Sequence, residues 1–321
     1  MAANKDIWVF TEKTALLPEL IAGARNLAEQ TGGKAVAVTL GPRQAAEKSF
    51  EMGAHMVLWL GELPPGRLVE DAVPTLAEAV RTAQPFGVLI GATTRGRAVA
   101  GRLAARLGTA ALTDALEFQY TNSGIQVKHM VFGGGAVRID RPVTGPFLAT
   151  VGSGVFEPLP QASGTSGEIQ TAVWIDPPWQ AVVVERRQRE SSSVNLAAAK
   201  RVVCPGRGLK QQEDLGMIEE LAQALSAEVA CTRPLAEGLN WLPRERYIGI
   251  SGAMIKPDLY IGIGVSGQAQ HTIGMNESRV VVAINKDRGA PLVAQADYAI
   301  EGDLYAVVPA LIRAIKAHKG K

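Results

Sequence analysis

Short apolar runs alternate with longer amphipathic segments through the first hundred residues of the chain. The apolar runs, which predict buried strands, lie at residues 7–10, 35–40, 57–60 and 87–90. Apolar residues at helical spacing follow several of these runs, for example at 18–30 and 98–107. Because strands that alternate with helices form parallel sheets with helices on their faces, this part of the chain predicts an α/β layer structure.

The pattern changes after Thr113, where strand-like runs follow one another without a helix-length segment between them. These runs cover residues 117–120, 126–132, 137–139 and 147–151. Asparagine and glycine separate them, as in the three glycines at 133–135. We therefore expect hairpins, or a mixed extension of the sheet, in this region.

Residues 157–193 are rich in proline, serine, glycine and glutamine, a composition typical of a connection between domains. A strand-like run at 181–185 interrupts this composition. We place the domain boundary near residue 195, which predicts an N-terminal domain of residues 1–194 and a C-terminal domain of residues 195–321.

A second series of strands and helices makes up the C-terminal domain. Its predicted strands are 201–205, 228–231, 247–251, 259–265, 280–284 and 296–300, and its predicted helices are 213–225 and 304–316. Asp303 directly precedes the last helix and suits its N-cap. The predicted fold class is therefore α/β, with two domains that are each a mainly parallel sheet flanked by helices.

Composition and charge exclude several classes of function. The chain of 321 residues has a net charge of +2 with both signs mixed, so it lacks the basic footprint of a nucleic-acid-binding protein. Cys204 and Cys231 stand in apolar contexts without metal-type spacing, and we expect them to be small buried residues. No nucleophile–base pair stands out, which disfavours a hydrolase. With neither a signal-peptide pattern nor a membrane-length apolar run, we expect a cytoplasmic protein.

Polar or glycine residues follow nearly every predicted strand of the C-terminal domain. These segments are 206–208, 232–234, 249–252, 266–271, 285–287 and 301–303. Parallel strands place such loops along one edge of the sheet, where glycines let backbone N–H groups approach an anion. Each segment alone also has a structural interpretation: Gly-Arg-Gly as a turn, Ser266-Gly267 as an N-cap, and His271 as a packing residue. Their shared polar character indicates a nucleotide site.

Several of these segments together resemble the α-subunit of electron-transfer flavoproteins. The motifs are GVSGQAQHTIGM at 264–275, VVVAINKD at 280–287, APLVAQADYAIEGDL at 290–304 and GRGL at 206–209. The resemblance is dense over residues 195–318 and looser before them, where VKHMVFGGGA at 127–136 resembles a family hairpin. The family's usual SGAIQH reads SGQAQH here, and its frequent GQTG reads GISG at 249–252.

The resemblance implies that the C-terminal domain is a Rossmann-like domain that binds FAD in an extended pose. The cofactor-binding residues that it implies are Arg207, Thr232, Arg233, Gly249, Ile250, Ser251, Ser266, Gly267, Gln268, Ala269, Gln270, His271, Asn285, Asp303 and Leu304. The resemblance implies that Asn285, Asp303 and Leu304 hold the AMP portion and that the loop 266–271 wraps the ribityl–pyrophosphate region. The residues that it places at the flavin end are Arg207, Arg233, Ser251, Gln270 and His271. We hypothesise that His271 donates a hydrogen bond to the flavin C2=O region and that Arg233 lies over the ring near N5.

The implied function is that of an electron carrier without substrate turnover of its own. The chain would pair with a β-subunit of related fold, with residues 127–136 reaching across the interface. It would take electrons from dehydrogenases and pass them to an acceptor through an anionic semiquinone. The alternatives are a nucleotide-dependent enzyme that uses FAD or NAD, and a structural nucleotide-binding module. A GxGxxG turn would have favoured an NAD enzyme, but none follows the first strand of either domain.

Overall fold

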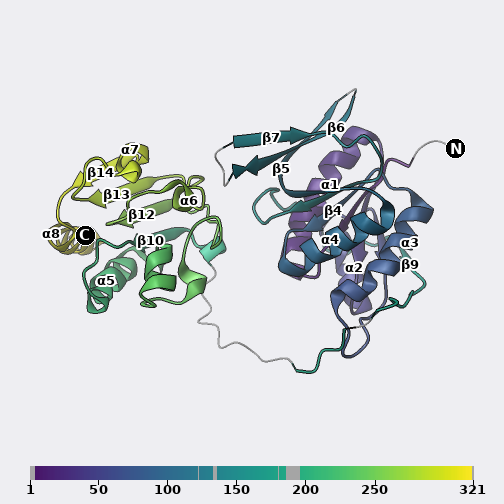
Figure 1. Cartoon of the computed structure of the whole chain (residues 1–321), viewed down its shortest axis with the longest axis horizontal. Helices are drawn as coiled ribbons and strands as arrows, with labels where there is room; N and C mark the ends of the chain where they lie inside the picture. Colours follow the sequence, from purple (N-terminus) through teal and green to yellow (C-terminus); the bar gives the residue numbers. More distant parts are fainter. Residues whose placement is uncertain (1–3, 122, 133–135, 180, 186–195, 320–321) are drawn as a thin grey trace. The chain divides into compact units, whose positions relative to one another are not determined.

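The computed structural model describes residues 4–121, 123–132, 136–179, 181–185 and 196–319. It divides the chain into two compact units, one built from residues 1–131 and 136–187 and the other mainly from residues 188–321 (Figure 1). Each unit contains its own sheet, with nine strands in the first and five in the second. The α/β fold class with two sheet-centred domains is confirmed.

The first unit begins with four parallel strands that alternate with four helices. The strands are β1 (Ile7–Phe10), β2 (Ala35–Thr39), β3 (Met56–Trp59) and β4 (Gly87–Gly91), and the helices are α1 (Leu17–Thr31), α2 (Arg43–Glu51), α3 (Val73–Ala83) and α4 (Thr94–Leu107). Helices α1 and α2 pack into the core on one face of the sheet, and α3 and α4 pack into a separate core on the other. This parallel βαβ alternation follows the apolar pattern of the sequence.

An antiparallel ribbon extends this sheet beyond β4. Its strands are β5 (Ala111–Thr121), β6 (Gly124–Val131) and β7 (Ala136–Asp140), and β8 (Phe147–Val151) lies parallel to both β4 and β5. The expected mixed extension is confirmed, although β5 starts six residues before the expected residue 117. The first residues of β5 pair with β8, and its register shifts between Leu112 and Ala115, where Asp114 has a φ of 52°.

The connecting segment differs from the prediction. Strand β9 (Glu168–Thr171), which was not predicted, pairs with β3 at the edge of the sheet. The strand expected at 181–185 is wrong, because residues 181–185 form no strand and Val184 is 97% exposed. The expected boundary near residue 195 stays a prediction, since residues 186–195 lie outside the part of the chain that the structure describes.

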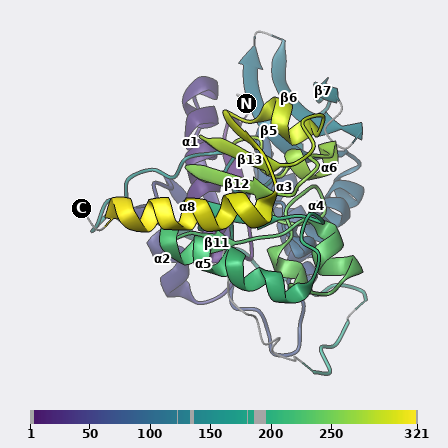
Figure 2. The same ribbon diagram turned by 90° about the vertical axis from the view of Figure 1, so that its left-hand side faces the viewer.

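The second unit is a five-stranded parallel sheet. In spatial order its strands are β11 (Glu228–Val229), β10 (Arg201–Pro205), β12 (Leu259–Ile263), β13 (Val281–Asn285) and β14 (Tyr298–Glu301). Helices α5 (Leu215–Leu225) and α8 (Leu304–Lys319) lie side by side over one face (Figure 2). Asp303 accepts a hydrogen bond from the Tyr305 N–H at 3.0 Å, which confirms it as the N-cap of α8.

Loops and short helices cover the other face of this second sheet. The two shortest α-helices are α6 (Ala269–Thr272) and α7 (Pro291–Gln295). Within the described residues, 3₁₀ helices cover Thr14–Leu16, Val69–Ala72, Leu196–Ala198, Gln212–Asp214 and Arg244–Arg246, and a π-helical turn covers Pro234–Gly238. The strand expected at 247–251 is wrong, because this segment makes only isolated bridges, at Tyr247 and Ile248. No helix in the described residues combines the length and apolar character needed to cross a membrane.

Candidate cofactor site

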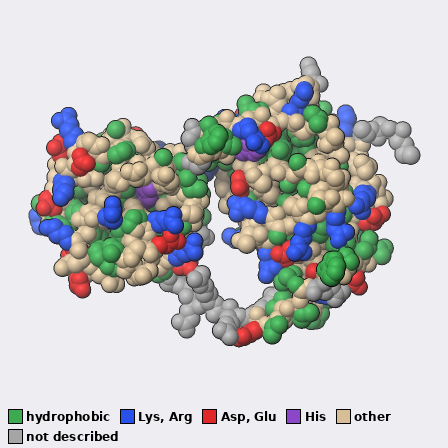
Figure 3. Space-filling view, in the orientation of Figure 1, with side chains coloured by type: hydrophobic (Ala, Val, Ile, Leu, Met, Phe, Trp, Pro, Cys, Tyr) green, Lys and Arg blue, Asp and Glu red, His purple; other side chains and the backbone are tan. Residues whose placement is uncertain are grey.

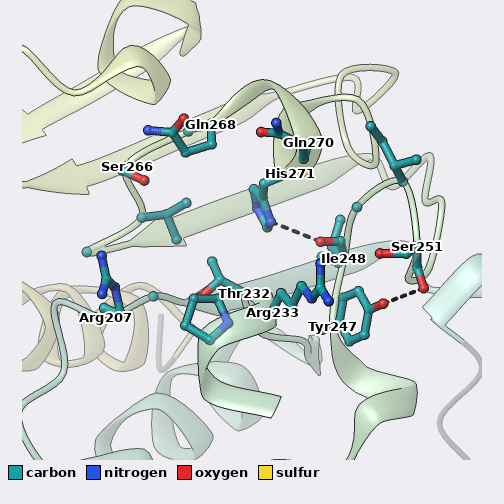
Figure 4. Close-up of a pocket in the computed structure, with 17 residues that line it drawn as sticks. Arg207, Thr232, Arg233, Tyr247, Ile248, Ser251, Ser266, Gln268, Gln270 and His271 are labelled. Carbon is teal, nitrogen blue, oxygen red and sulfur yellow. Dashed lines mark hydrogen bonds between the residues drawn. The ribbon is translucent and has the colours of Figure 1, made fainter. Parts of the chain in front are cut away.

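A cavity of about 580 Å³ opens at the carboxyl edge of the second sheet (Figure 4). The loops after β10, β11 and β12, the start of α6 and the segment 247–251 enclose it. Its lining residues are Gly206, Arg207, Thr232, Arg233, Pro234, Tyr247, Ile248, Gly249, Ile250, Ser251, Gly264, Val265, Ser266, Gly267, Gln268, Gln270 and His271. The volume lies in the range of about 300–1,000 Å³ that is typical of small-molecule and cofactor sites.

Glycines let the loops that form this cavity touch through their backbones. A Cβ on Gly206 would lie 2.4 Å from the carbonyl oxygen of Gly264, and one on Gly208 would lie 2.6 Å from the Gly264 Cα. Gly267 has a φ of +81°, and a Cβ there would lie 2.3 Å from the Leu292 nitrogen. Only glycine meets both requirements at residue 267, so sequence and packing together determine the path of the 266–268 turn.

Unpaired hydrogen-bond donors line one side of the cavity. The backbone N–H groups of residues 266–270 have no acceptor within the described parts of the chain. The Arg207 guanidinium likewise has no partner there, and no carboxylate is among the lining residues. The hydroxyl of Thr232 is buried without a hydrogen bond. A dinucleotide fits this donor set, since a pyrophosphate accepts hydrogen bonds from backbone N–H groups and pairs with a guanidinium.

His271 lines the cavity with its ring largely buried, and both of its ring nitrogens have partners. The Nδ1 atom lies 3.1 Å from the carbonyl oxygen of Ile248, and Nε2 lies 2.7 Å from the hydroxyl of Tyr260. Since a carbonyl only accepts, Nδ1 carries the proton and Nε2 accepts from Tyr260. Burial lowers the pKa of His271 to about 4, so the ring is neutral near pH 7.

This arrangement bears on the hypothesis that His271 donates to a flavin carbonyl. The single N–H of the neutral ring is already bonded to Ile248. Donation to the cofactor would require the ring to exchange this bond or to take up a second proton. The donor role stays a prediction. The structure shows that Tyr260 holds the ring, a role not predicted from the sequence because Tyr260 lies in the apolar run 259–263.

Arg233 reaches the cavity from the turn after β11, and an acidic partner holds its side chain. Its Nε donates to Glu237 at 2.5 Å, and Glu237 also pairs with the Arg244 Nε at 3.0 Å. The hydrogen bond from Arg233 to Glu237 raises the pKa of Arg233 above its usual value, so the guanidinium remains charged. The sequence predicted Arg233 at this site but not the carboxylate beside it.

Four of the expected cofactor-binding residues are not among those that line the cavity: Ala269, Asn285, Asp303 and Leu304. The Asn285 side chain donates to the Val265 carbonyl at 2.9 Å and accepts from the Asp287 N–H at 3.0 Å. Asp303 caps α8, and Leu304 is buried behind Gly208 and Gly264. None of these three residues lines this cavity, and their expected place at the AMP portion stays a prediction.

Two family profiles match this chain. One, described as the electron transfer flavoprotein FAD-binding domain, covers residues 195–276. The other, described as the electron transfer flavoprotein domain, covers residues 14–175. The first range contains every residue that lines the cavity.

Curated relatives match along almost the whole chain. "Protein FixB" of Escherichia coli O157:H7 and that of Shigella flexneri are each 38% identical over 316 residues, which is 98% of this chain and 99% of the relative. "Putative electron transfer flavoprotein subunit YdiR" of Escherichia coli K12 is 38% identical over 312 residues, 97% of this chain and 98% of the relative.

Proposed function

Because the chain belongs to the α-subunit family of electron transfer flavoproteins, we propose that it carries electrons from dehydrogenases to a redox acceptor as one half of a heterodimer. Its cofactor is FAD, which the C-terminal domain of this family binds. The observation that supports the site most directly is the coincidence of the FAD-binding profile with the donor-lined cavity of the second unit.

The residues of the cavity divide by what they would do for the cofactor. FAD supplies reversible electron transfer at its isoalloxazine ring. The N–H groups of 266–270 and the Arg207 guanidinium would bind the pyrophosphate, because they are free donors without a competing carboxylate. Arg233, Ser251 and Gln270 would lie at the isoalloxazine end, where a fixed positive charge favours the reduced, anionic ring.

Asn285, Asp303 and Leu304 would support the loops of the site. Asn285 ties the end of β13 to Val265 in the cavity wall, and Leu304 packs behind the contact between Gly208 and Gly264. We propose that these residues, with the Asp303 cap, hold the loops in place and lie at the AMP portion, as the resemblance implies. The expected passage through an anionic semiquinone, the lack of substrate turnover and a cytoplasmic location remain parts of the proposal.

The β-subunit would contact the first unit at the outer face of β6 and β7. Cross-strand register puts Met130 opposite Val137 and Lys128 opposite Ile139 on one face of this ribbon. Val137 and Ile139 are more than half exposed, and Met130 is 37% exposed. Figure 3 shows hydrophobic side chains among charged ones over this ribbon. Contiguous apolar groups of this kind are typical of protein interfaces.

Purification with the β-subunit, followed by a flavin count and a reductive titration, tests the proposal. We expect bound FAD that is retained by this chain and reduced in two resolved one-electron steps, the first giving the absorbance of a red anionic semiquinone. A colourless complex that stays colourless after incubation with FAD would overturn the proposal. Bound flavin that resists reduction would favour the structural module, and substrate turnover by this chain alone would favour the enzyme.

A substitution pair locates the cofactor in the cavity. Arg207→Ala removes the unpaired guanidinium from the lining and should increase FAD loss during gel filtration by about tenfold, in line with the ~1.5–3 kcal/mol of a charge-assisted hydrogen bond. Arg279→Ala is the matched control, because Arg279 is also exposed in the second unit but does not line the cavity. Equal FAD retention by the two variants would place the pyrophosphate elsewhere.

A further inference from the structure

The π-helical turn at Pro234–Gly238 places two oppositely charged side chains together beside the cavity. Arg233 precedes the turn and lines the cavity, whereas Glu237 lies inside the turn and does not. The N–H of Leu239 bonds to the carbonyl of Pro234 at 2.9 Å, which closes the wide turn. Such turns are rare and recur at functional sites, which directs attention to the pair that this one presents.

Glu237 binds Arg233 through only one of its three guanidinium nitrogens. The hydrogen bond runs from Nε, at 2.5 Å, and the two terminal nitrogens of Arg233 have no acceptor among the described residues. A guanidinium is planar, so a carboxylate on Nε fixes the plane of the group while leaving its outer edge available. The free edge of Arg233 belongs to a residue that lines the cavity (Figure 4).

The same carboxylate is shared with a second cation. Arg244, on the 3₁₀ turn Arg244–Arg246, forms an ion pair with the other oxygen of Glu237, at 3.0 Å from its Nε. Glu237 is about one-quarter exposed, whereas both arginines are about two-thirds exposed. The negative charge therefore lies partly shielded between two more exposed positive charges, and it opposes the field of each.

We propose that Glu237 is a positioning residue that orients the Arg233 guanidinium toward the flavin ring and reduces the positive potential that this guanidinium exerts there. The inference rests on the proposed function, because it takes the ligand of the cavity to be the flavin. Two effects of Glu237 follow, one on the geometry of Arg233 and one on its field. They are separable, since glutamine keeps a hydrogen-bond acceptor at the same place while removing the charge.

The test compares Glu237→Gln with Glu237→Ala in the FAD-loaded complex with the β-subunit. With a glutamine amide as the acceptor, Arg233 should keep its orientation while its charge is no longer opposed. The equilibrium constant for one-electron reduction should then rise about three- to tenfold, where tenfold corresponds to ~59 mV. With alanine, Arg233 loses its anchor and turns partly to solvent, so the rise should be smaller than with glutamine or should reverse. The readout is the midpoint potential of the bound flavin, measured by spectroelectrochemical titration.

Two further variants keep the test decisive if the Glu237 variants do not fold. In Arg244→Gln the Glu237 charge is opposed by Arg233 alone, so the equilibrium constant for one-electron reduction should fall. Arg313→Gln, which removes an exposed charge from α8, should leave this constant unchanged. Equal potentials for Glu237→Gln, Glu237→Ala and the wild type would overturn the inference, as would equal shifts in the two Glu237 variants or equal effects of Arg244→Gln and Arg313→Gln.

The flavin count separates failure of the inference from failure of the proposed function. If the wild-type complex binds no flavin, the proposed function fails. If every variant retains FAD as the wild type does but the potentials do not divide as described, only the role of Glu237 fails.

Discussion

Burial decides the protonation of His271, and with it what this residue can do at the cavity. Removing the imidazole from water destabilises its cationic form, and its two nitrogens find partners that suit the neutral ring. Tyr260, the donor to Nε2, is fully buried, and burial raises the pKa of its hydroxyl well above the usual value, so it stays a donor. The pair therefore forms a fixed, uncharged wall of the site.

We expect His271 to remain neutral, with its proton on Nδ1, until the pH falls to about 4. ¹⁵N NMR of histidine-labelled protein measures both the tautomer and the titration, and the His271→Asn variant assigns the signal among the four histidines. Tyr260→Phe should raise the pKa of His271, because it removes the hydroxyl that donates a hydrogen bond to Nε2 and so stabilises the neutral ring. A ring that titrates near pH 6.5, or that carries its proton on Nε2, would contradict this prediction.

The lowered pKa of His271 also makes stability depend on pH. Between pH 6.5 and about 4 the unfolded chain binds a proton at this residue and the folded chain does not. Stability should therefore fall as the pH drops through this window, by up to about 3 kcal/mol from this residue. Urea unfolding of the second unit at pH 7 and pH 5 measures the loss, which should shrink in His271→Asn and persist in His55→Gln, a change in the first unit.

Residue types alone could predict which side chains line the site, but not how they pair. Arg207, Arg233 and His271 were predicted because they follow strands that end at one sheet edge. Tyr260 was hidden because its neighbours in β12 are apolar and its hydroxyl meets His271 only in the folded unit. The resemblance assigns Asn285, Asp303 and Leu304 to the AMP portion, which stays a prediction, and only the folded unit shows their contacts with the loops.

At the scale of the element, the shape of the cavity depends on the path of the turn that follows β12. The turn after β12 runs against the start of α7, so that Leu292 occupies the space a side chain at residue 267 would need. The backbone there is left-handed, with a φ of +81°. The donors of residues 266–270 therefore face the cavity only while residue 267 has no side chain.

Gly267→Ala should destabilise the second unit by about 1–3 kcal/mol and release FAD, because it adds both a clash and a strained backbone. Gly216→Ala is the matched control. Gly216 lies in α5, an added Cβ there meets nothing within 4 Å, and alanine favours a helix by roughly 0.5–1 kcal/mol. Thermal unfolding and FAD retention measure both effects; wild-type behaviour of Gly267→Ala would contradict the role given to this turn.

Apolar patterning predicted the buried elements well and the exposed ones poorly. The runs at 147–151 and 201–205 coincide with β8 and β10, because strands buried on both faces of a parallel sheet consist mostly of apolar residues. Strand β9 was not predicted because its residues, EIQT, are mostly exposed and pair only with β3 at the edge of the sheet. The run at 181–185 has an apolar composition but pairs with no strand, and most of its residues are exposed.

At the scale of the whole molecule, the division into two units matches the two family profiles, one for each unit. The donor-lined cavity belongs to the second unit, whereas the first unit holds the larger, nine-stranded sheet. Its distinctive feature is the antiparallel ribbon with an apolar outer face, which suits a role in assembly. Composition indicated the division between units because the segment 157–193 is rich in proline, serine, glycine and glutamine.

Ile139→Lys should weaken binding of the β-subunit by at least about tenfold, because it puts a charge into the apolar outer face of β7. Val143→Lys is the control, since Val143 is 86% exposed in the loop that follows β7. Analytical ultracentrifugation of the mixed subunits measures the dissociation constant. Wild-type affinity for Ile139→Lys would remove β6 and β7 from the interface.

The two cysteines provide a built-in reporter of motion in one half of the molecule. Cys204 and Cys231 are fully buried, both lie in the second unit, and no other cysteine is present. Burial raises the pKa of Cys231 to about 12 and that of Cys204 further, so neither thiol reacts while the sheet stays closed. The rate at which a maleimide labels this protein therefore reports transient opening of the second unit alone, because the first unit has no cysteine. Bound FAD should lower this labelling rate.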